Sequence, residues 1–148
     1  MTAQCGEKLY YNGELHSMAT EPLTYYLKSS KLEFKFTPPN TALWRGYVGT
    51  WEIKNDKLYL IDLECFVDKG VRGISYIFNE KKEVFADWFS SQIRLPEGEI
   101  LMYIHGGYDS IYERDVFLNF KNGILISSEV VENSISEEEF KKWNDLPF

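Results

Sequence analysis

Hydrophobic and polar side chains alternate along most of this chain, with the period of two that is typical of β-strands. In two stretches such strands flank an Asn-Gly pair, at Asn12-Gly13 and at Asn122-Gly123. Both central residues of a two-residue hairpin turn need positive φ angles, and this pair tolerates them well. We therefore predict β-hairpins over residues 8–18 and 116–131.

The longest alternating pattern is LWRGYVGTWEIKNDKLYLIDLECF, residues 43–66, which reads as two strands around Asn55-Asp56. Near this turn both faces of the predicted hairpin are apolar. We expect both faces to be covered there, as in a sandwich or in a sheet with a helix on it.

The far end of the same hairpin is polar on one face. If Asn55-Asp56 forms a two-residue turn, Gly49 lies opposite Asp62 and Tyr47 lies opposite Glu64. Arg45 follows one pair further along. Four side chains are then expected to project from one side as a polar patch: Arg45, Tyr47, Asp62 and Glu64.

Three other stretches have strand character. Residues 31–39 alternate and are ended by Pro38-Pro39, and residues 84–95 form an aromatic-rich strand. A bend is expected at residues 96–98. The period of residues 99–105 does not distinguish a strand from a short helix.

Two short helices are expected. Thr20 can cap the first, and Pro22 falls in its first turn, where a missing N–H costs nothing. This helix ends near Ser29. The second is expected in the C-terminal segment, where Ser136 and Glu139 form the pattern of a capping box.

Strands dominate, with about eight expected, mostly in antiparallel hairpins. We predict an α+β fold: a predominantly antiparallel β-sheet, sandwich-like or barrel-like, with two short helices, one of them C-terminal. The chain has 148 residues and is 44% hydrophobic, which suits one globular domain, residues 1–148, with a core of its own.

Charge narrows the class of partner. The formal net charge is -7, and residues 129–148 carry six acidic and two basic side chains. Such a surface repels phosphate backbones, so nucleic acid is not an expected partner. It attracts a cationic protein and speeds the encounter, although acidic residues also serve solubility alone.

Several classes of site are excluded or disfavoured by residue counts. Cys5 and Cys65 lie far apart and form no CxxC, so neither a disulfide framework nor a cysteine metal site is expected. Cys65 lies in an apolar strand, where it suits a core. With two histidines the chain cannot form a three-histidine zinc site. We find no nucleotide-binding or zinc-protease motif, and predict no cofactor and no metal.

The chain lacks an apolar run of the ~20 residues that a membrane span needs. The N-terminus also lacks the basic and apolar regions of a signal peptide. If Met1 is the natural start, we expect a cytoplasmic protein without a membrane partner.

The run YIHGGYDSIYERD, residues 103–115, is the richest in chemically active side chains. His105 with its two following glycines matches the oxyanion holes of some esterases, but no nucleophile elbow accompanies it. His105 could also be a general base oriented by Asp109 or Glu113. The bland alternative is a glycine-containing loop between two strands. A fourth interpretation is a protein-binding surface, because tyrosine gives large contact area at low entropic cost. The candidate binding residues here are Tyr103, His105, Tyr108, Asp109, Tyr112, Glu113 and Arg114.

The polar patch has two interpretations as well. Two carboxylates beside an arginine can form an acid–base site. More often such a set is a cross-strand group of ion pairs.

Three blocks of the chain, LWRGYVGTWEIKNDKLYL, FADWFSSQIRLPEGEIL and YIHGGYDSIYERDVFL, carry a resemblance. In them the chain resembles a family of small bacterial proteins that share WRGY–TWEI–LYL, RLPxGEIL and HxGYxSxYExD blocks. The resemblance covers roughly residues 7–132 and implies one compact domain and no particular chemistry. Small acidic proteins of this type are often immunity proteins beside bacterial toxins, which is an argument by analogy with a class.

Taken together, these features favour a non-enzymatic cytoplasmic binding protein, and in particular an immunity protein that neutralises a cognate toxin. The alternative is a small-molecule-binding or hydrolytic β domain that uses the His105 loop and the Arg45/Asp62/Glu64 patch. A third hypothesis is an accessory domain whose polar clusters are structural.

Overall fold

The structure, a computed structural model, describes residues 3–30, 33–79 and 81–134. It contains two helices, α1 (Pro22–Ser29) and α2 (Ser75–Phe78). The strands are β1 (Glu7–Tyr11), β2 (Glu14–Met18), β3 (Tyr47–Lys54), β4 (Lys57–Val67), β5 (Gly70–Arg72), β6 (Val84–Phe85), β7 (Gln92–Met102), β8 (Ile111–Lys121) and β9 (Ile124–Glu132).

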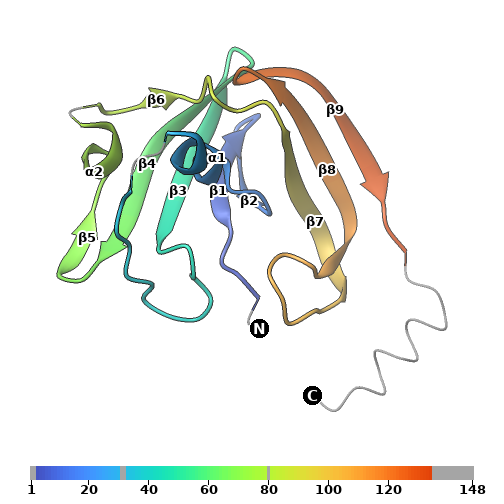
Figure 1. The fold of residues 1–148 in the computed structure, drawn as a ribbon. Coiled ribbons are helices and arrows are strands. Elements are labelled where there is room, and N and C mark those ends of the chain that lie inside the picture. The colour runs from blue at the N-terminus through green and yellow to red at the C-terminus, as the bar shows by residue number, and fades with distance from the viewer. Residues whose placement is uncertain (1–2, 31–32, 80, 135–148) are drawn as a thin grey trace.

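All nine strands belong to one curved sheet with the order β2-β1-β3-β4-β9-β8-β7, while β5 and β6 pair with β4 (Figure 1). Neighbouring strands are antiparallel except β1 and β3, which run parallel. The predicted α+β class with a mostly antiparallel sheet is therefore confirmed. The sheet is not closed into a barrel. The strands at the two ends of this order are β2 and β7. Ala19, directly after β2, donates its backbone N–H to Arg94 O of β7 at 2.9 Å.

The three predicted hairpins are present. Asn12-Gly13 connects β1 to β2, Asn55-Asp56 connects β3 to β4, and Asn122-Gly123 connects β8 to β9. Every one of these turn residues has a positive φ, between 51° and 77°. Local turn chemistry therefore determines the chain reversals that organise the sheet.

The predicted register of the β3–β4 hairpin holds only near its turn. Trp51 pairs with Leu60, but Thr50 pairs with Asp62, so Ile61 is an extra residue in a β-bulge. Because side chains alternate between faces, one inserted residue moves every later side chain of that strand to the other face. Beyond the bulge, Leu63 therefore faces the core together with Leu60.

The bulge makes the predicted polar patch wrong. Glu64 lies opposite Val48, and Tyr47 lies opposite Cys65. Tyr47 is buried in the core, whereas Asp62 and Glu64 are exposed. The expectation of two covered faces also fails near the turn: Trp51, Leu58 and Leu60 are buried, but Tyr59 and Ile61 on the other face are only half-buried.

Two predicted strands differ from the structure. Among described residues 33–39 the backbone forms no strand, although Phe34 and Phe36 pack against the core. The alternation of apolar and polar residues in this segment therefore reflects burial of one side of the chain, and not hydrogen-bonded pairing with another strand. The aromatic stretch 84–95 is divided into β6 and the start of β7, because residues 86–91 bend to place Phe89 in the core. The bend expected at 96–98 is an irregularity within β7, which continues to Met102.

The first helix is confirmed as α1, with Pro22 in its first turn. Thr20 does not cap it: Glu21 holds that position without a side-chain cap, and Thr20 Oγ1 accepts a hydrogen bond from Arg94 N. The predicted C-terminal helix lies outside the described residues. The four-residue helix α2 was not predicted.

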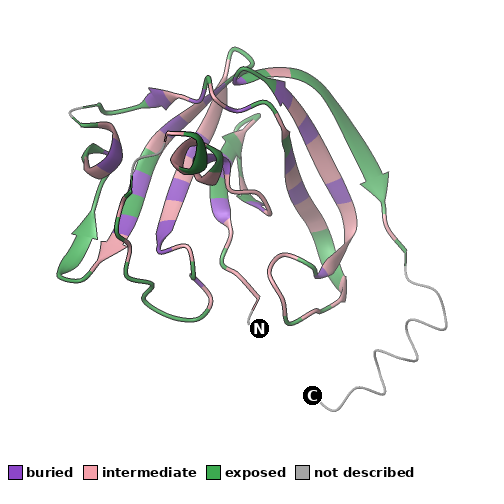
Figure 2. Ribbon diagram, in the orientation of Figure 1, coloured by how far each residue is buried: buried purple, intermediate pink, exposed green. Residues whose placement is uncertain are grey.

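The core fills the space enclosed by the sheet, where buried positions recur along the inner sides of the strands (Figure 2). Its largest members are aromatic, and Trp51 and Phe89 are fully buried. Helix α1 adds Leu23 to this core. Tyr26 packs on Trp88, whose indole donates to Pro22 O at 2.9 Å. The helix start is therefore held against the segment between β6 and β7, next to the site described below.

Candidate functional site

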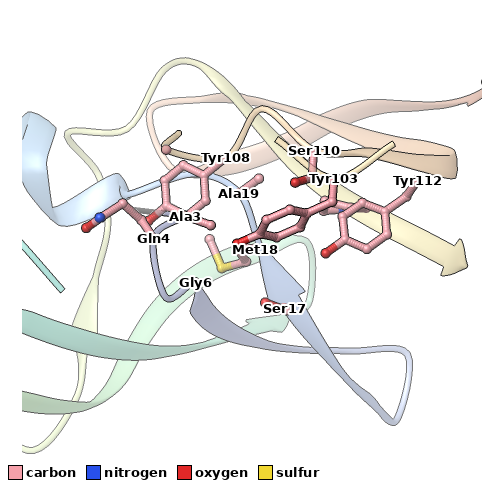
Figure 3. Close-up of a pocket in the computed structure, with 12 residues that line it drawn as sticks. Ala3, Gln4, Gly6, Ser17, Met18, Ala19, Tyr103, Tyr108, Ser110 and Tyr112 are labelled. Carbon is pink, nitrogen blue, oxygen red and sulfur yellow. The ribbon is translucent and has the colours of Figure 1, made fainter. Parts of the chain in front are cut away.

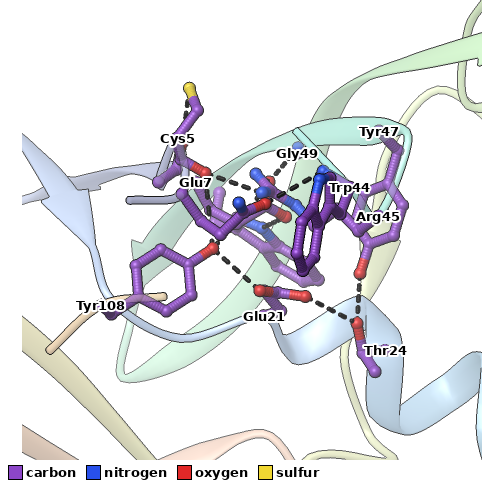
Figure 4. Close-up of polar contacts among 12 residues, drawn as sticks. Cys5, Glu7, Glu21, Thr24, Trp44, Arg45, Tyr47, Gly49 and Tyr108 are labelled. Atoms are coloured by element: carbon purple, nitrogen blue, oxygen red, sulfur yellow. Dashed lines mark hydrogen bonds and ion pairs between the residues drawn. The ribbon is translucent and has the colours of Figure 1, made fainter. Parts of the chain in front are cut away.

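A buried ion pair lies at the start of β1. Glu7 is fully buried, and Arg45 Nη2 donates to its Oε2 at 2.8 Å (Figure 4). Gly49 N donates to the same oxygen at 2.7 Å, and Trp51 Nε1 donates to Oε1 at 3.3 Å. Both carboxylate oxygens therefore have donors, which offsets part of the cost of burying the charge.

A second set of hydrogen bonds extends from this pair to the 103–110 loop. Arg45 Nη1 donates to the Tyr108 hydroxyl at 3.3 Å, and that hydroxyl donates to Glu21 Oε2 at 2.8 Å. Thr24 Oγ1 donates to Glu21 Oε1 at 3.2 Å and also bonds to the Tyr47 hydroxyl. The network joins β1, the start of α1, the segment before β3 and the loop (Figure 4).

Burial controls the protonation of this network. It raises the pKa of Glu7 to about 7, against the opposing effects of the Arg45 charge and the hydrogen bond from Gly49. Burial also raises the pKa of the Tyr47 and Tyr108 phenols. Both tyrosines therefore remain neutral near pH 7, and Glu7 is sealed from any dissolved substrate. Such an arrangement orders the chain and does not expose an acid or a base.

The raised pKa of Glu7 predicts that stability falls as pH rises from about 4.5 to about 7. In that window the folded protein keeps a proton that the unfolded chain has released. Raising pH then favours unfolding by at most about 1.4 kcal/mol per pH unit, and the slope disappears above the folded-state pKa. Urea unfolding from about pH 5.5 to about pH 8 should show this slope in the difference between the wild type and Glu7→Gln. Parallel curves for the two proteins would contradict it.

Arg94 on β7 holds the 103–110 loop from the other side. Its Nε pairs with Asp115 Oδ1 at 2.8 Å, while Nη1 donates to Tyr108 O at 2.6 Å and Nη2 to Ser110 O at 3.1 Å. The N-terminal segment adds a third anchor, because Gln4 N donates to Gly107 O at 2.8 Å. The loop is therefore held by side chains and backbone from three parts of the chain.

The remaining candidate residues of this run lie around the loop and on β8. The His105 side chain is exposed and its ring meets Tyr103 edge-on, with 4.6 Å between centroids. Glu113 accepts a hydrogen bond from Glu99 N and pairs with Arg114 at 3.6 Å. Asp109 is exposed. The structure thus confirms a loop between two strands. The contacts of Glu113 named above are with Glu99 and Arg114, and not with His105, which it was predicted to orient.

Three predicted tyrosines, Tyr103, Tyr108 and Tyr112, line one pocket of about 110 Å³ (Figure 3). Met18 and Pro96 are among its other apolar lining residues. We call this pocket the tyrosine slot. It is well below the ~300–1,000 Å³ of a site for a drug-sized ligand. A wider and more open hollow lies beyond Tyr108 and is lined in part by Glu21, Thr24, Lys28 and Gln92.

Strands β7–β9 form the acidic side of the molecule. Residues 92–134 include seven carboxylates and three basic side chains. The carboxylates are Glu97, Glu99, Asp109, Glu113, Asp115, Glu129 and Glu132, and the basic residues are Arg94, Arg114 and Lys121.

Strand β9 is an edge along most of its length. It pairs with β8 from residue 124 to residue 132, but within the described part of the chain its ladder with β4 is limited to Ile124 opposite Lys57. Four of its large apolar side chains are exposed, with Ile126 at 62% and Val130 at 60% the most open; the others are Ile124 and Val131. In this part of the molecule an apolar strand edge is thus combined with a negative charge.

Within residues 3–30, 33–79 and 81–134, no group of three or more His, Cys, Asp or Glu side chains is placed to hold a metal ion. Nor does any helix in these ranges have the length and apolarity to cross a membrane.

Sequence reasoning missed Glu7, Glu21 and Thr24. A usable signal existed for Glu7, because it alternates in phase with the buried Leu9 and so belongs to the inner face of β1. No comparable local signal marks Glu21 and Thr24. Glu21 bonds to Tyr108 and Thr24 bonds to Tyr47, and both tyrosines come from distant segments of the chain. Of the predicted patch, Arg45 and Tyr47 belong to the network, and Asp62 and Glu64 do not.

Comparisons with known proteins identify no relative of this chain. No family model matches the chain, and neither the curated proteins nor the solved structures contain a match to it. The resemblance to a family of small bacterial proteins therefore stays a prediction.

Proposed function

We propose that this chain is a non-enzymatic protein-binding protein of the immunity type, which holds a cationic partner, such as a toxin, against strands β7–β9. The observation that carries the proposal is β9, an open strand edge with exposed Ile126 and Val130 among carboxylates. Large exposed apolar groups on a strand edge are a liability unless another surface covers them.

The charge around β9 supports a basic partner. Glu129 and Glu132 are exposed on β9 itself. On the other side of β8, Glu99 is exposed on β7 and Asp109 on the loop between β7 and β8. Complementary charge speeds association and suppresses wrong partners, while apolar and backbone groups at the centre supply most of the affinity. A cationic protein that adds a strand to β9 would satisfy both parts of this surface.

The hydrolytic alternative has less support. Its patch of Arg45, Asp62 and Glu64 does not assemble, because the bulge at Ile61 moves Glu64 opposite Val48. The carboxyl group of Glu7, whose pKa is raised to about 7, is fully buried. A cytoplasmic location and membership of the bacterial family of small acidic proteins belong to the same proposal.

The proposal predicts a salt-sensitive complex between the tagged full chain and the product of the neighbouring gene. We expect capture at about 0.05 M salt, and association at least about tenfold slower at about 0.5 M, because exposed charges are screened. The double charge reversal Glu129→Lys/Glu132→Lys should slow association at low salt by a similar factor.

A matched control reverses the same number of charges elsewhere. Asp62→Lys/Glu64→Lys alters two exposed carboxylates on β4 and should leave association nearly unchanged. Equal slowing by both double variants would mean that net charge acts and that β9 is not the interface. Failure to capture the neighbour when it is expressed would remove the proposal.

A further inference from the structure

The tyrosine slot is built so that its aromatic walls are held in place. The Tyr108 hydroxyl is occupied by Glu21 at 2.8 Å and Arg45 at 3.3 Å, so its ring is held between the network and the slot. In the view of Figure 3, Tyr108 lies on one side of Met18, and Tyr103 and Tyr112 lie on the other. A wall of this kind is pre-organised, which lowers the entropic cost of binding.

The size of the slot restricts its occupant. A volume of about 110 Å³ accommodates the end of one amino-acid side chain and excludes a nucleotide or a drug-sized molecule. A slot of this size is typical of a pocket that receives an anchor residue of a protein partner.

The chemistry of the walls indicates which side chain. All twelve residues that line the slot are uncharged. Three of them are tyrosines, whose ring faces attract cations. The Tyr108 hydroxyl donates to the Glu21 carboxylate and accepts from the Arg45 guanidinium, so one negative and one positive group lie at that end of the ring. Exposed Asp109 follows Tyr108 directly in the chain, so the loop that builds the slot carries negative charge as well.

We propose that the tyrosine slot receives the cationic end of a basic side chain, such as lysine, of the partner. This inference rests on the proposed function for its biological meaning, but binding of the side chain itself can be tested without the partner. The slot would then supply the selectivity for a basic anchor residue that the open edge of β9 cannot supply, because backbone pairing does not distinguish side chains.

The test compares two probes that share the same four-carbon side chain and differ in the terminal ammonium group, which only lysine carries. The full chain is titrated with N-acetyl-lysine amide and with N-acetyl-norleucine amide, followed by amide chemical shifts. We expect the lysine probe to shift amides near residues 17–19 and 103–112, with a millimolar Kd at least about threefold tighter than that of norleucine. Equal or tighter binding of norleucine, or no shift at these residues, would overturn the inference.

Two tyrosine variants provide the matched control. Tyr103→Leu keeps an apolar wall but removes one of three rings, so it should reduce the preference for the lysine probe. Tyr10→Leu changes a tyrosine of similar exposure, 42% against 36%, that is not part of the slot, and should have no effect. A preference unchanged in Tyr103→Leu would count against the slot. Failure here, with the neighbour's product still captured, would reject the slot alone and leave the proposed function standing.

Discussion

Replacing Arg45 with alanine is expected to destabilise the protein by about 3–5 kcal/mol, because it leaves the Glu7 carboxylate buried without its cation. The change also removes donors to Cys5 O and to the Tyr108 hydroxyl. Urea unfolding at constant pH measures the loss. The loss should be larger at about pH 8 than at about pH 5.5, because protonation of Glu7 relieves the unpaired charge.

Two controls separate the buried pair from other effects. Glu7→Gln/Arg45→Met removes both charges and should cost less than Arg45→Ala alone, because no ion is left without a partner. Lys54→Ala breaks an exposed ion pair of the same 2.8 Å length with Glu83 and should cost far less. If Arg45→Ala and Lys54→Ala had similar effects, the Glu7–Arg45 pair could not be buried in solution as described.

Replacing Gly123 with alanine is expected to cost about 3–4 kcal/mol, because two penalties combine at one position. Its φ is +77°, which side chains with a Cβ rarely adopt. A Cβ built there would also lie 2.5 Å from Ala86 O, a backbone atom that cannot move aside easily. The turn between β8 and β9 packs so closely on the segment after β6 that only a hydrogen fits.

Gly13 is the matched control for this substitution. It occupies the same position of the Asn12-Gly13 turn, with a φ of +76°, and a Cβ there would meet nothing within 4 Å. Gly13→Ala should therefore cost only the backbone strain, about 1–2 kcal/mol. The difference between the two variants measures the close approach at Gly123, and equal costs would show that this approach is absent.

Local turn chemistry made much of the fold predictable. The three hairpins follow from Asn-Gly and Asn-Asp pairs whose positive φ angles the structure contains. The residues that were predicted as one tyrosine-rich binding run also come together, since Tyr103, Tyr108 and Tyr112 line one slot. The hairpins depend on a few neighbouring residues, which is why the sequence alone reveals them. The slot itself was not predicted, because Met18 and Pro96, which also line it, come from other strands.

The bulge at Ile61 was not predictable from its own strand. Leu58, Leu60, Leu63 and Cys65 are all apolar, and either phase of the alternation looks acceptable until the core is known. A single extra residue therefore decided whether Glu64 joined Tyr47 or faced solvent. The same limitation explains the missed network, whose members depend on contacts between segments far apart in the chain.

The Tyr108 hydroxyl accepts from Arg45 and donates to Glu21, partners that precede it by 63 and 87 residues. A ribosome adds about 5–20 residues per second, so Tyr108 emerges roughly 4–17 s after Glu21. Until then a growing chain lacks the Tyr108 wall of the slot, and β9, which follows Tyr108, has not been made. The proposed binding surface consequently exists only after β9, residues 124–132, has been synthesised. Fragments released early in synthesis would lack it and could not occupy the partner unproductively.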